Sequence, residues 1–227
     1  MLSMHSVSSE IPRGQTTHDR IVAEAAAVFN RRGYAGTALS DLMEATGLKK
    51  GGIYRHFSSK EELAAAAFEY SWKVVSSLRL EGIEKIASPL GRIRRLIANY
   101  ARRVPSPLPG GCPLMNTAVD ADDTNPQLLE LARKALHQLQ GRLAEAFAEA
   151  RRLGEVRRSV DPNRAAGFVI SSLQGALLLS RIEGHRAPLH NAEKELQAWL
   201  RTLLPPPPVR RSGTKSAGST RPSRQRA

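Results

Sequence analysis

The chain of 227 residues carries a formal net charge of +13, from 34 basic and 21 acidic side chains, and it holds a single cysteine. One cysteine excludes an intrachain disulfide, and an aromatic content of 5% disfavours binding of single-stranded nucleic acid by base stacking. The uncharged stretch 165–180 is too short and too polar for a membrane span, and the N-terminus lacks the apolar run of a signal peptide. We therefore expect a cytoplasmic protein without a membrane partner, whose positive charge suits a polyanion.

The N-terminal residues 1–15 are polar and irregular, and we expect them to be disordered. A helix then begins at Thr16 or Thr17, where a hydroxyl can cap it, and it ends at Gly33. Its apolar residues form one stripe at helical spacing, namely Ile21, Val22, Ala25, Val28 and Phe29. This helix is placed to support the segment that follows it.

Two short helices joined by a tight turn are predicted between residues 37 and 57. Thr37 can cap the first helix, and Gly47 can end it in the left-handed conformation. The second helix, over 49–57, places Ile53 and Phe57 on one face. The other face carries donors and a glycine that permits close approach: Lys49, Lys50, Gly51, Tyr54, Arg55 and His56. Such a helix suits the major groove of DNA, so the pair is a helix-turn-helix in which Lys49, Lys50, Gly51 and Arg55 can reach base edges.

The remainder of the chain predicts further helices and needs no strand. Ser59 can cap a long helix over 60–86, and a proline at the first helical position starts helices after Ser88, Asn125 and Asp161. These helices run over 88–104, 124–153 and 161–183, with a short helix over 111–120 and a last one over 189–204. The fold class is therefore all-α. A three-helix DNA-binding domain over 16–60 precedes a larger helical domain over 61–204.

The helix-turn-helix residues form a specific pattern: Thr37, Asp41-Leu42, Ala45-Thr46-Gly47, Lys50-Gly51, Tyr54-Arg55-His56-Phe57 and Ser59-Lys60-Glu61-Glu62-Leu63. Over about Thr16 to Leu63 the chain resembles the DNA-binding domain of TetR/AcrR-type transcriptional regulators. The resemblance implies that Thr37, Tyr54, His56 and Lys60 contact phosphates, which positions the duplex rather than reading its sequence. One departure is Lys49, which stands where many members have a serine that caps the recognition helix.

The resemblance also implies what the larger domain does. Members bind a small-molecule effector among the body helices, and candidate lining residues here are Tyr70, Trp72, Tyr100, Cys112, Met115, Asn116, Phe168 and Gln174. Members dimerise through a four-helix bundle, and the two last helices supply the corresponding candidates Phe168, Leu173, Leu177, Leu196, Trp199, Leu200 and Leu203. The alternative for both sets is that the side chains simply complete the core of one protomer.

Cys112 stands at the start of the short helix, in the sequence Gly111-Cys112-Pro113-Leu114 with Asn116 downstream. This resembles a subset of the family in which a cysteine senses oxidants or electrophiles. Peptide N–H groups at a helix start stabilise a thiolate, and Arg102 and Arg103 lie nearby in sequence. The alternative is that Cys112 is a small buried apolar residue.

Residues 205–227 form a basic tail that we expect to be disordered, either without a specific role or as a non-specific phosphate contact. No catalytic motif, cofactor-binding loop or metal-ligand spacing is present, so we expect no enzyme activity, no cofactor and no metal.

We interpret the chain as a homodimeric DNA-binding regulator, a repressor released from a palindromic operator by a small-molecule effector. The alternatives are a sensor acting through Cys112 and a non-specific basic DNA-binding protein.

Overall fold

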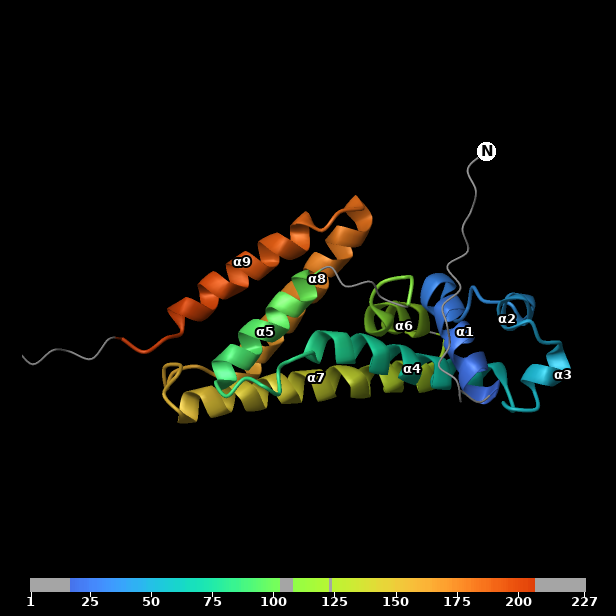
Figure 1. Cartoon of the computed structure of the whole chain (residues 1–227), viewed down its shortest axis with the longest axis horizontal. Coiled ribbons are helices and arrows are strands. Elements are labelled where there is room, and N and C mark those ends of the chain that lie inside the picture. The colour runs from blue at the N-terminus through green and yellow to red at the C-terminus, as the bar shows by residue number, and fades with distance from the viewer. Residues whose placement is uncertain (1–16, 103–107, 123, 207–227) are drawn as a thin grey trace, which may run out of the picture.

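The computed structural model describes residues 17–102, 108–122 and 124–206. Within them it has nine helices and no strand, which confirms the all-α prediction. The helices are α1 Thr17–Arg32, α2 Leu39–Thr46, α3 Lys50–Ile53, α4 Lys60–Leu80, α5 Pro89–Ala101, α6 Pro113–Ala121, α7 Pro126–Arg152, α8 Pro162–Glu183 and α9 Ala187–Thr202. The molecule is elongated, with α1, α2 and α3 at one end and α5, α8 and α9 towards the other (Figure 1). The tail from 207 and the N-terminal residues 1–16 lie outside the described residues.

The small end of the molecule, which we call the head, is built from α1, α2, α3 and the start of α4. Its core is aliphatic and aromatic: Ile21, Val22, Ala25, Ala26, Val28, Leu42, Ile53, Phe57, Leu63 and Ala67 are all buried. The turn between α2 and α3 depends on Gly47, whose φ of 67° is a left-handed conformation that favours glycine. The predicted apolar stripe of the first helix thus packs against the helix-turn-helix from behind.

The remaining helices form the body, whose core lies among α5, α7, α8 and α9. The largest buried side chains there include Phe147 of α7, Ile93 and Ile97 of α5, Leu173 of α8, and Leu196 and Leu200 of α9. Local signals set the ends of α8 as predicted, because Asp161 accepts a hydrogen bond from the Arg164 amide at 3.0 Å and Gly184 adopts a φ of 72°.

Helix α4 joins the head to the body, and it ends earlier than predicted. The sequence indicated a helix to residue 86, whereas α4 ends at Leu80 and Gly82 follows with a φ of 73°. The side-chain amide of Asn99, on α5, donates to the Arg79 carbonyl at 2.9 Å and to the Glu81 carbonyl at 3.0 Å. These bonds satisfy carbonyls that a helix end leaves without partners, so the end of α4 is fixed by α5.

The prediction that Thr37 caps α2 is wrong. Thr37 is 1% exposed, and its hydroxyl donates to the Gly33 carbonyl at 2.6 Å instead. The residue at the cap position is Ala38, whose amide donates to the Asp41 carboxylate at 2.8 Å. Asp41 lies in the first turn, where a carboxylate meets the positive end of the helix dipole, so it stabilises the helix start that Thr37 does not.

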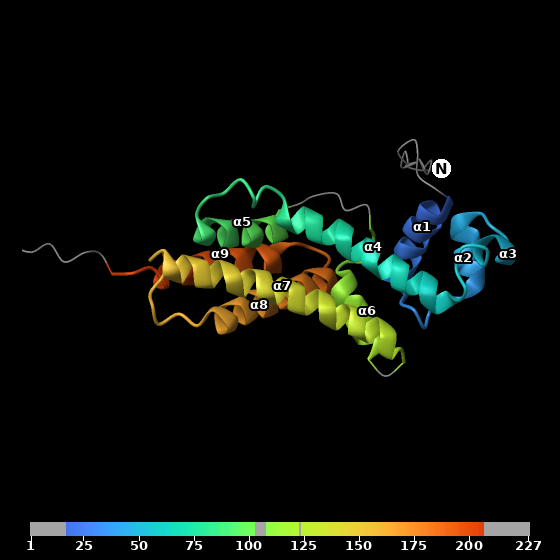
Figure 2. The same ribbon diagram turned by 90° about the horizontal axis from the view of Figure 1, so that it is seen from below.

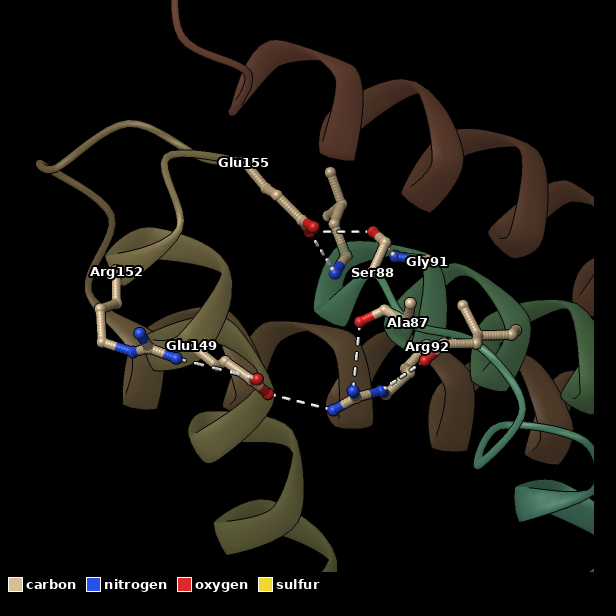
Figure 3. A network of polar contacts seen from close by, with 9 residues as sticks. Ala87, Ser88, Gly91, Arg92, Glu149, Arg152 and Glu155 are labelled. Carbon is tan, nitrogen blue, oxygen red and sulfur yellow. Dashed lines mark hydrogen bonds and ion pairs between the residues drawn. The ribbon is translucent and has the colours of Figure 1, made fainter.

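A polar network fixes the start of α5 to the far end of α7 (Figure 3). The Glu155 carboxylate accepts from the Ser88 hydroxyl at 2.9 Å and from the Leu90 amide at 2.8 Å. Arg92 donates to the carbonyls of Ile86 and Ala87, at 2.8 and 3.1 Å, and pairs with Glu149 at 3.0 Å. One carboxylate of the α7–α8 loop therefore replaces two bonds that the start of α5 would otherwise make with water.

We predict that Glu155→Ala lowers the free energy of unfolding by about 1–3 kcal/mol, because the Leu90 amide and the Ser88 hydroxyl lose their shared acceptor. Urea denaturation measures the change. The exposed Glu195 of α9 provides the control, and Glu195→Ala should shift stability by less than about 0.5 kcal/mol. Equal effects of the two variants would contradict a structural role for Glu155.

Candidate functional site

The recognition helix α3 is shorter than the predicted 49–57. It spans Lys50–Ile53, and the chain continues in turns through Tyr54, Arg55 and His56. The turns keep helix-like hydrogen bonds, since the Phe57 amide donates to the Ile53 carbonyl at 3.2 Å and the His56 amide to the same carbonyl at 3.0 Å. Ile53 and Phe57 are 1% and 3% exposed, so both anchor this segment on the head core. The opposite side of the segment is left at the surface.

Six of the eight predicted DNA-binding residues lie on that exposed side: Lys49, Lys50, Gly51, Tyr54, Arg55 and His56. A Cβ built on Gly51 would meet no atom within 4 Å, so the backbone there is open to close approach by a partner. The Lys50 ammonium lies 5.8 Å from the centre of the Tyr54 ring. The segment thus presents cationic and neutral donors beside an open stretch of backbone, which suits a phosphate-bearing groove.

The other two predicted residues are engaged within the protein. The Lys60 ammonium donates to the Tyr34 carbonyl at 2.8 Å and lies 4.2 Å from the centre of the Tyr34 ring. Thr37 is buried, as described above. Burial and the hydrogen bond of the Tyr34 hydroxyl to Glu61 raise the pKa of Tyr34 to about 12. In this structure Lys60 and Thr37 therefore hold the loop between α1 and α2 rather than face outward.

Two residues that the sequence did not single out support the recognition segment. The Arg20 guanidinium donates to the Thr46 carbonyl at 2.8 Å, which ties α1 to the end of α2. The His18 ring stacks on Phe57 with centroids 4.8 Å apart and meets the His56 ring edge-on at 6.3 Å. No sequence signal predicts these contacts, because they depend on how α1 crosses the helix-turn-helix.

A joint between head and body is built around α6, which contacts α1 and lies beside it in Figure 1. The Asn116 amide of α6 donates to the Asn30 carbonyl and to the Gly110 carbonyl, at 2.9 and 2.8 Å. Further along α6, the Asp120 carboxylate accepts from the Tyr34 amide at 2.5 Å and from the Ala35 amide at 3.3 Å. Helix α6 therefore touches both the end of α1 and the loop that precedes α2.

The body contains a buried polar cluster, made of Arg79 of α4, Tyr100 of α5, Cys112 before α6 and Gln174 of α8. Arg79, Tyr100 and Cys112 are 8%, 7% and 2% exposed. The Arg79 guanidinium lies 4.3 Å from the centre of the Tyr100 ring. Its Nη1 atom and both polar side-chain atoms of Gln174 have no hydrogen-bond partner. Three predicted effector residues, Tyr100, Cys112 and Gln174, thus lie around the guanidinium of Arg79, a residue that carried no signal in the sequence.

The electrostatics of this cluster favour charge on Arg79 and on the thiol. Burial raises the pKa of the Cys112 thiol, but the Arg79 guanidinium, with smaller effects of the Met115 backbone and Gln174, outweighs burial and holds that pKa below its ordinary range. Burial opposes the charge of Arg79, whereas Tyr100 and Cys112 favour it, so the pKa of Arg79 is raised. Burial also raises the pKa of Tyr100, and the neighbouring Arg79 opposes this.

The other predicted pocket residues do not all join this cluster. Trp72 packs between the body core and the apolar side chains around Cys112, and Met115 packs among the latter. Tyr70 packs against the head core, and Asn116 belongs to the joint. Phe168 is 48% exposed and meets Trp199 edge-on at 4.8 Å, away from the cluster. Arg102, proposed as a neighbour of Cys112, pairs with Glu81 instead, and Arg103 lies outside the described residues.

An open hollow of about 930 Å³ lies between the end of α1, α6 and α8. Cys112 stands at its wall, together with Met115, Leu177 and Leu189. The described residues that line it include four arginines, Arg31, Arg32, Arg181 and Arg186, against one carboxylate, Asp120. The hollow is therefore lined by apolar side chains and an excess of cations, and Cys112 belongs both to its lining and to the buried cluster.

The predicted dimer residues fall into two groups. Leu173, Leu196, Leu200 and Leu203 are buried in the core of the protomer, so they complete that core as the alternative reading had it. Phe168 remains exposed, and Leu177 and Trp199 are half-buried. The predicted interface set does not include three further exposed apolar residues on α8, namely Leu178, Leu179 and Ile182. Helix α8 is the one helix, within the described residues, that is long and apolar enough to cross a membrane by length and composition alone.

Two family models match the chain. Residues 21–67 match "Bacterial regulatory proteins, tetR family", and residues 89–196 match "Tetracyclin repressor-like, C-terminal domain". The first match covers α2, α3 and most of α1, and the second covers α5 to most of α9. The boundary between the two matches falls in α4 and the loop after it.

Known proteins of the same kind match over most of the chain. The HTH-type transcriptional repressor DhaR of Mycobacterium sp. (strain GP1) is 30% identical over 190 residues, which are 82% of this chain and 91% of that protein. The crystal structure of a TetR transcriptional regulator from Chloroflexus aurantiacus J-10-FL has a TM-score of 0.78 and 41% sequence identity. The match covers 84% of this chain and 97% of that one. The crystal structure of a TetR-family transcriptional regulator from Cytophaga hutchinsonii has a TM-score of 0.78 and 31% sequence identity. The match covers 86% of this chain and 98% of that one.

We predict that the thiol of Cys112, the single cysteine, titrates below the ordinary midpoint of about 8.5, because the Arg79 charge stabilises the thiolate. Ultraviolet thiolate absorbance against pH measures this. In Arg79→Met the midpoint should rise above the ordinary value, since burial then acts alone, and Arg95→Met on the exposed side of α5 should leave it unchanged. A high midpoint in the wild-type protein would contradict the electrostatic account.

Proposed function

This chain belongs to the TetR family of DNA-binding transcriptional regulators, and we propose that it acts as a homodimeric repressor released from a palindromic operator by a small-molecule effector. The observation that carries the proposal is the exposed donor surface of α3 and the turn after it, anchored from behind by Ile53 and Phe57. The matched families and relatives are transcriptional regulators rather than enzymes.

The recognition segment suits one half of an operator. Lys49, Lys50 and Arg55 are exposed cations, and Arg or Lys donates well to the O6 and N7 acceptors of guanine in the major groove. Tyr54 and His56 lie at the same surface and can donate hydrogen bonds, which suits phosphate oxygens. We assign sequence reading to Lys49, Lys50, Gly51 and Arg55, and positioning on the backbone to Tyr54 and His56.

A second copy of the chain supplies the recognition segment that binds the second half of the operator. Phe168, Leu178, Leu179 and Ile182 expose large apolar side chains along α8, and Trp199 of α9 packs beside Phe168. Several large apolar side chains exposed along one helix are typical of a protein–protein interface. A two-fold dimer through α8 and α9 presents two recognition segments, and the symmetry of the dimer then requires a near-palindromic operator.

Helix α6 couples the body to the head in this proposal. Its first residues adjoin Cys112 and the buried cluster, while Asn116 and Asp120 hold Asn30 and the Tyr34 loop of the head. An effector that moves the start of α6 therefore moves the contacts that orient the recognition segment. Release from DNA requires the effector to bind the DNA-incompetent arrangement more tightly than the competent one.

A second candidate is regulation through the thiol of Cys112, and the neighbouring Arg79 guanidinium favours it. A thiolate beside a buried cation is the nucleophilic form that reacts with electrophiles. Cys112 is 2% exposed but stands at the wall of the open hollow, so a small reagent can approach it from that side. The titration of Cys112 tests the premise, because a thiol with a high pKa removes this candidate.

We predict that selection from a random duplex library yields a palindrome, and that Arg55→Ala changes which bases are preferred while costing about 1–3 kcal/mol at the affected position. Tyr54→Phe should weaken binding to all sequences similarly, since it removes a phosphate contact. Affinity measurements at several salt concentrations separate the two effects.

Arg152→Ala, at the end of α7 far from the head, is the control and should leave both affinity and preference unchanged (Figure 2). A specific regulator should prefer its operator over random DNA by about 10³ or more. Selection without any enriched sequence would instead support the non-specific basic DNA binder.

We predict that Leu179→Glu combined with Ile182→Glu weakens dimerisation by about 100-fold or more, because the interface would then bury two unpaired carboxylates. Sedimentation equilibrium measures the dissociation constant. The control is Leu153→Glu, since Leu153 is 52% exposed at the end of α7 and Leu179 is 50% exposed on α8. Unchanged dimerisation in the α8 variant would place the interface elsewhere.

A further inference from the structure

Arg79 is a buried charge without a carboxylate partner in the described part of the chain. It is 8% exposed, and none of the ion pairs found among the described residues includes it. Buried charges in proteins are generally paired, because removing an ion from water is costly. The ring of Tyr100 offsets part of this cost through a cation–π contact at 4.3 Å. One N–H group, at Nη1, still has no acceptor.

The residues around Arg79 offer further unused hydrogen-bonding groups. Both polar side-chain atoms of Gln174, on α8, are buried without a hydrogen-bond partner, and the Gln174 side chain lies near enough to Cys112 to help lower the pKa of its thiol. Arg186, which lines the hollow, has a buried Nε atom that is likewise without a partner. Several buried polar groups without partners in one region indicate a site whose hydrogen bonds are completed by a bound molecule.

The hollow next to this cluster also favours a negatively charged ligand. Four arginines and one aspartate line it, while its walls include Met115, Leu177 and Leu189. A ligand that filled the hollow and also bonded to Arg79 in the buried cluster would be apolar along its length and negatively charged at one end. Carboxylates match a guanidinium best, because they can accept two parallel hydrogen bonds from it.

We propose that the effector is a small amphipathic carboxylate, whose anionic end binds Arg79 and Gln174 and whose apolar part occupies the hollow beside Cys112. This inference rests on the proposed function and names the class of its ligand. The carboxylate enters past Cys112, and α6 begins at the next residue, so binding acts directly on the helix that holds the head. The ligand also competes with the thiol of Cys112 for the same guanidinium.

Calorimetric titration of the full chain with hexanoate and benzoate, against hexanamide and benzamide, tests the proposal. The carboxylates should bind about 10- to 100-fold more tightly than the matched amides, since the charged hydrogen bonds are lost in the amides. Arg79→Met should abolish this preference, and Arg79→Lys should retain part of it. Arg95→Met on the exposed side of α5 is the matched control and should behave as the wild-type protein.

Two further readouts keep the test independent of folding. Urea denaturation should show Arg79→Met to be at least as stable as the wild-type protein, because an unpaired buried charge is replaced by an apolar side chain of similar length. Hexanoate should also reduce the thiolate absorbance of Cys112 in the wild-type protein, because it takes over the Arg79 contact. A purely structural arginine would produce neither the amide discrimination nor the spectral change.

Equal affinity for carboxylates and amides would overturn the inference, and so would carboxylate binding that survives Arg79→Met. Carboxylate binding confined to Cys112→Ser would overturn it as well, since the thiolate would then be the partner of Arg79. The proposed function is tested separately by operator selection and by the α8 variants. A protein that selects a palindrome and dimerises, but ignores carboxylates, would contradict this inference alone.

Discussion

The body of the molecule depends on a guanidinium held away from water at the meeting of four segments. Arg79 comes from α4, Tyr100 from α5, Cys112 from the start of α6 and Gln174 from α8. A buried charge costs folding energy unless something nearby neutralises it or bonds to it. Whatever does so must lie between these helices, so their relative positions are sensitive to its identity. This sensitivity is the physical basis of the effector response that we propose.

Helix α6 is the element that would carry such a change to the head in the proposed mechanism. It begins beside the cluster, and its side chains at Asn116 and Asp120 hold backbone groups of the head at hydrogen-bond distance. These groups are the Asn30 carbonyl and the Tyr34 and Ala35 amides, so the contacts fix the position of the main chain rather than of a flexible side chain. In the proposed mechanism a shift of α6 breaks these contacts together, which favours two discrete arrangements over a continuous range.

Local signals in the sequence located the helices, whereas residues whose role depends on neighbours were missed. Asp161-Pro162 and Gly184 bound α8 where expected, because caps and left-handed glycines act within a few residues. Thr37 has the same chemistry as a cap, yet Ala38 occupies the cap position with its amide bonded to the Asp41 carboxylate, and Thr37 bonds to Gly33. Arg79 carried no signal beyond its helical spacing from Val75, since a charged residue on α4 normally faces solvent. Its burial is fixed by α5, α6 and α8.

The composition of α8 has a cause that the protomer alone does not supply. Its inner side packs Val169, Ile170 and Leu173 into the body core, which accounts for half of an apolar surface that extends nearly all round. The outer side places Phe168, Leu178, Leu179 and Ile182 in water, and burying such side chains is worth about 1.5–3 kcal/mol each. A helix that keeps this surface in a basic, charged protein is stabilised when a like surface covers it. The homodimer that we propose would complete this burial, and it would place two recognition segments on one duplex.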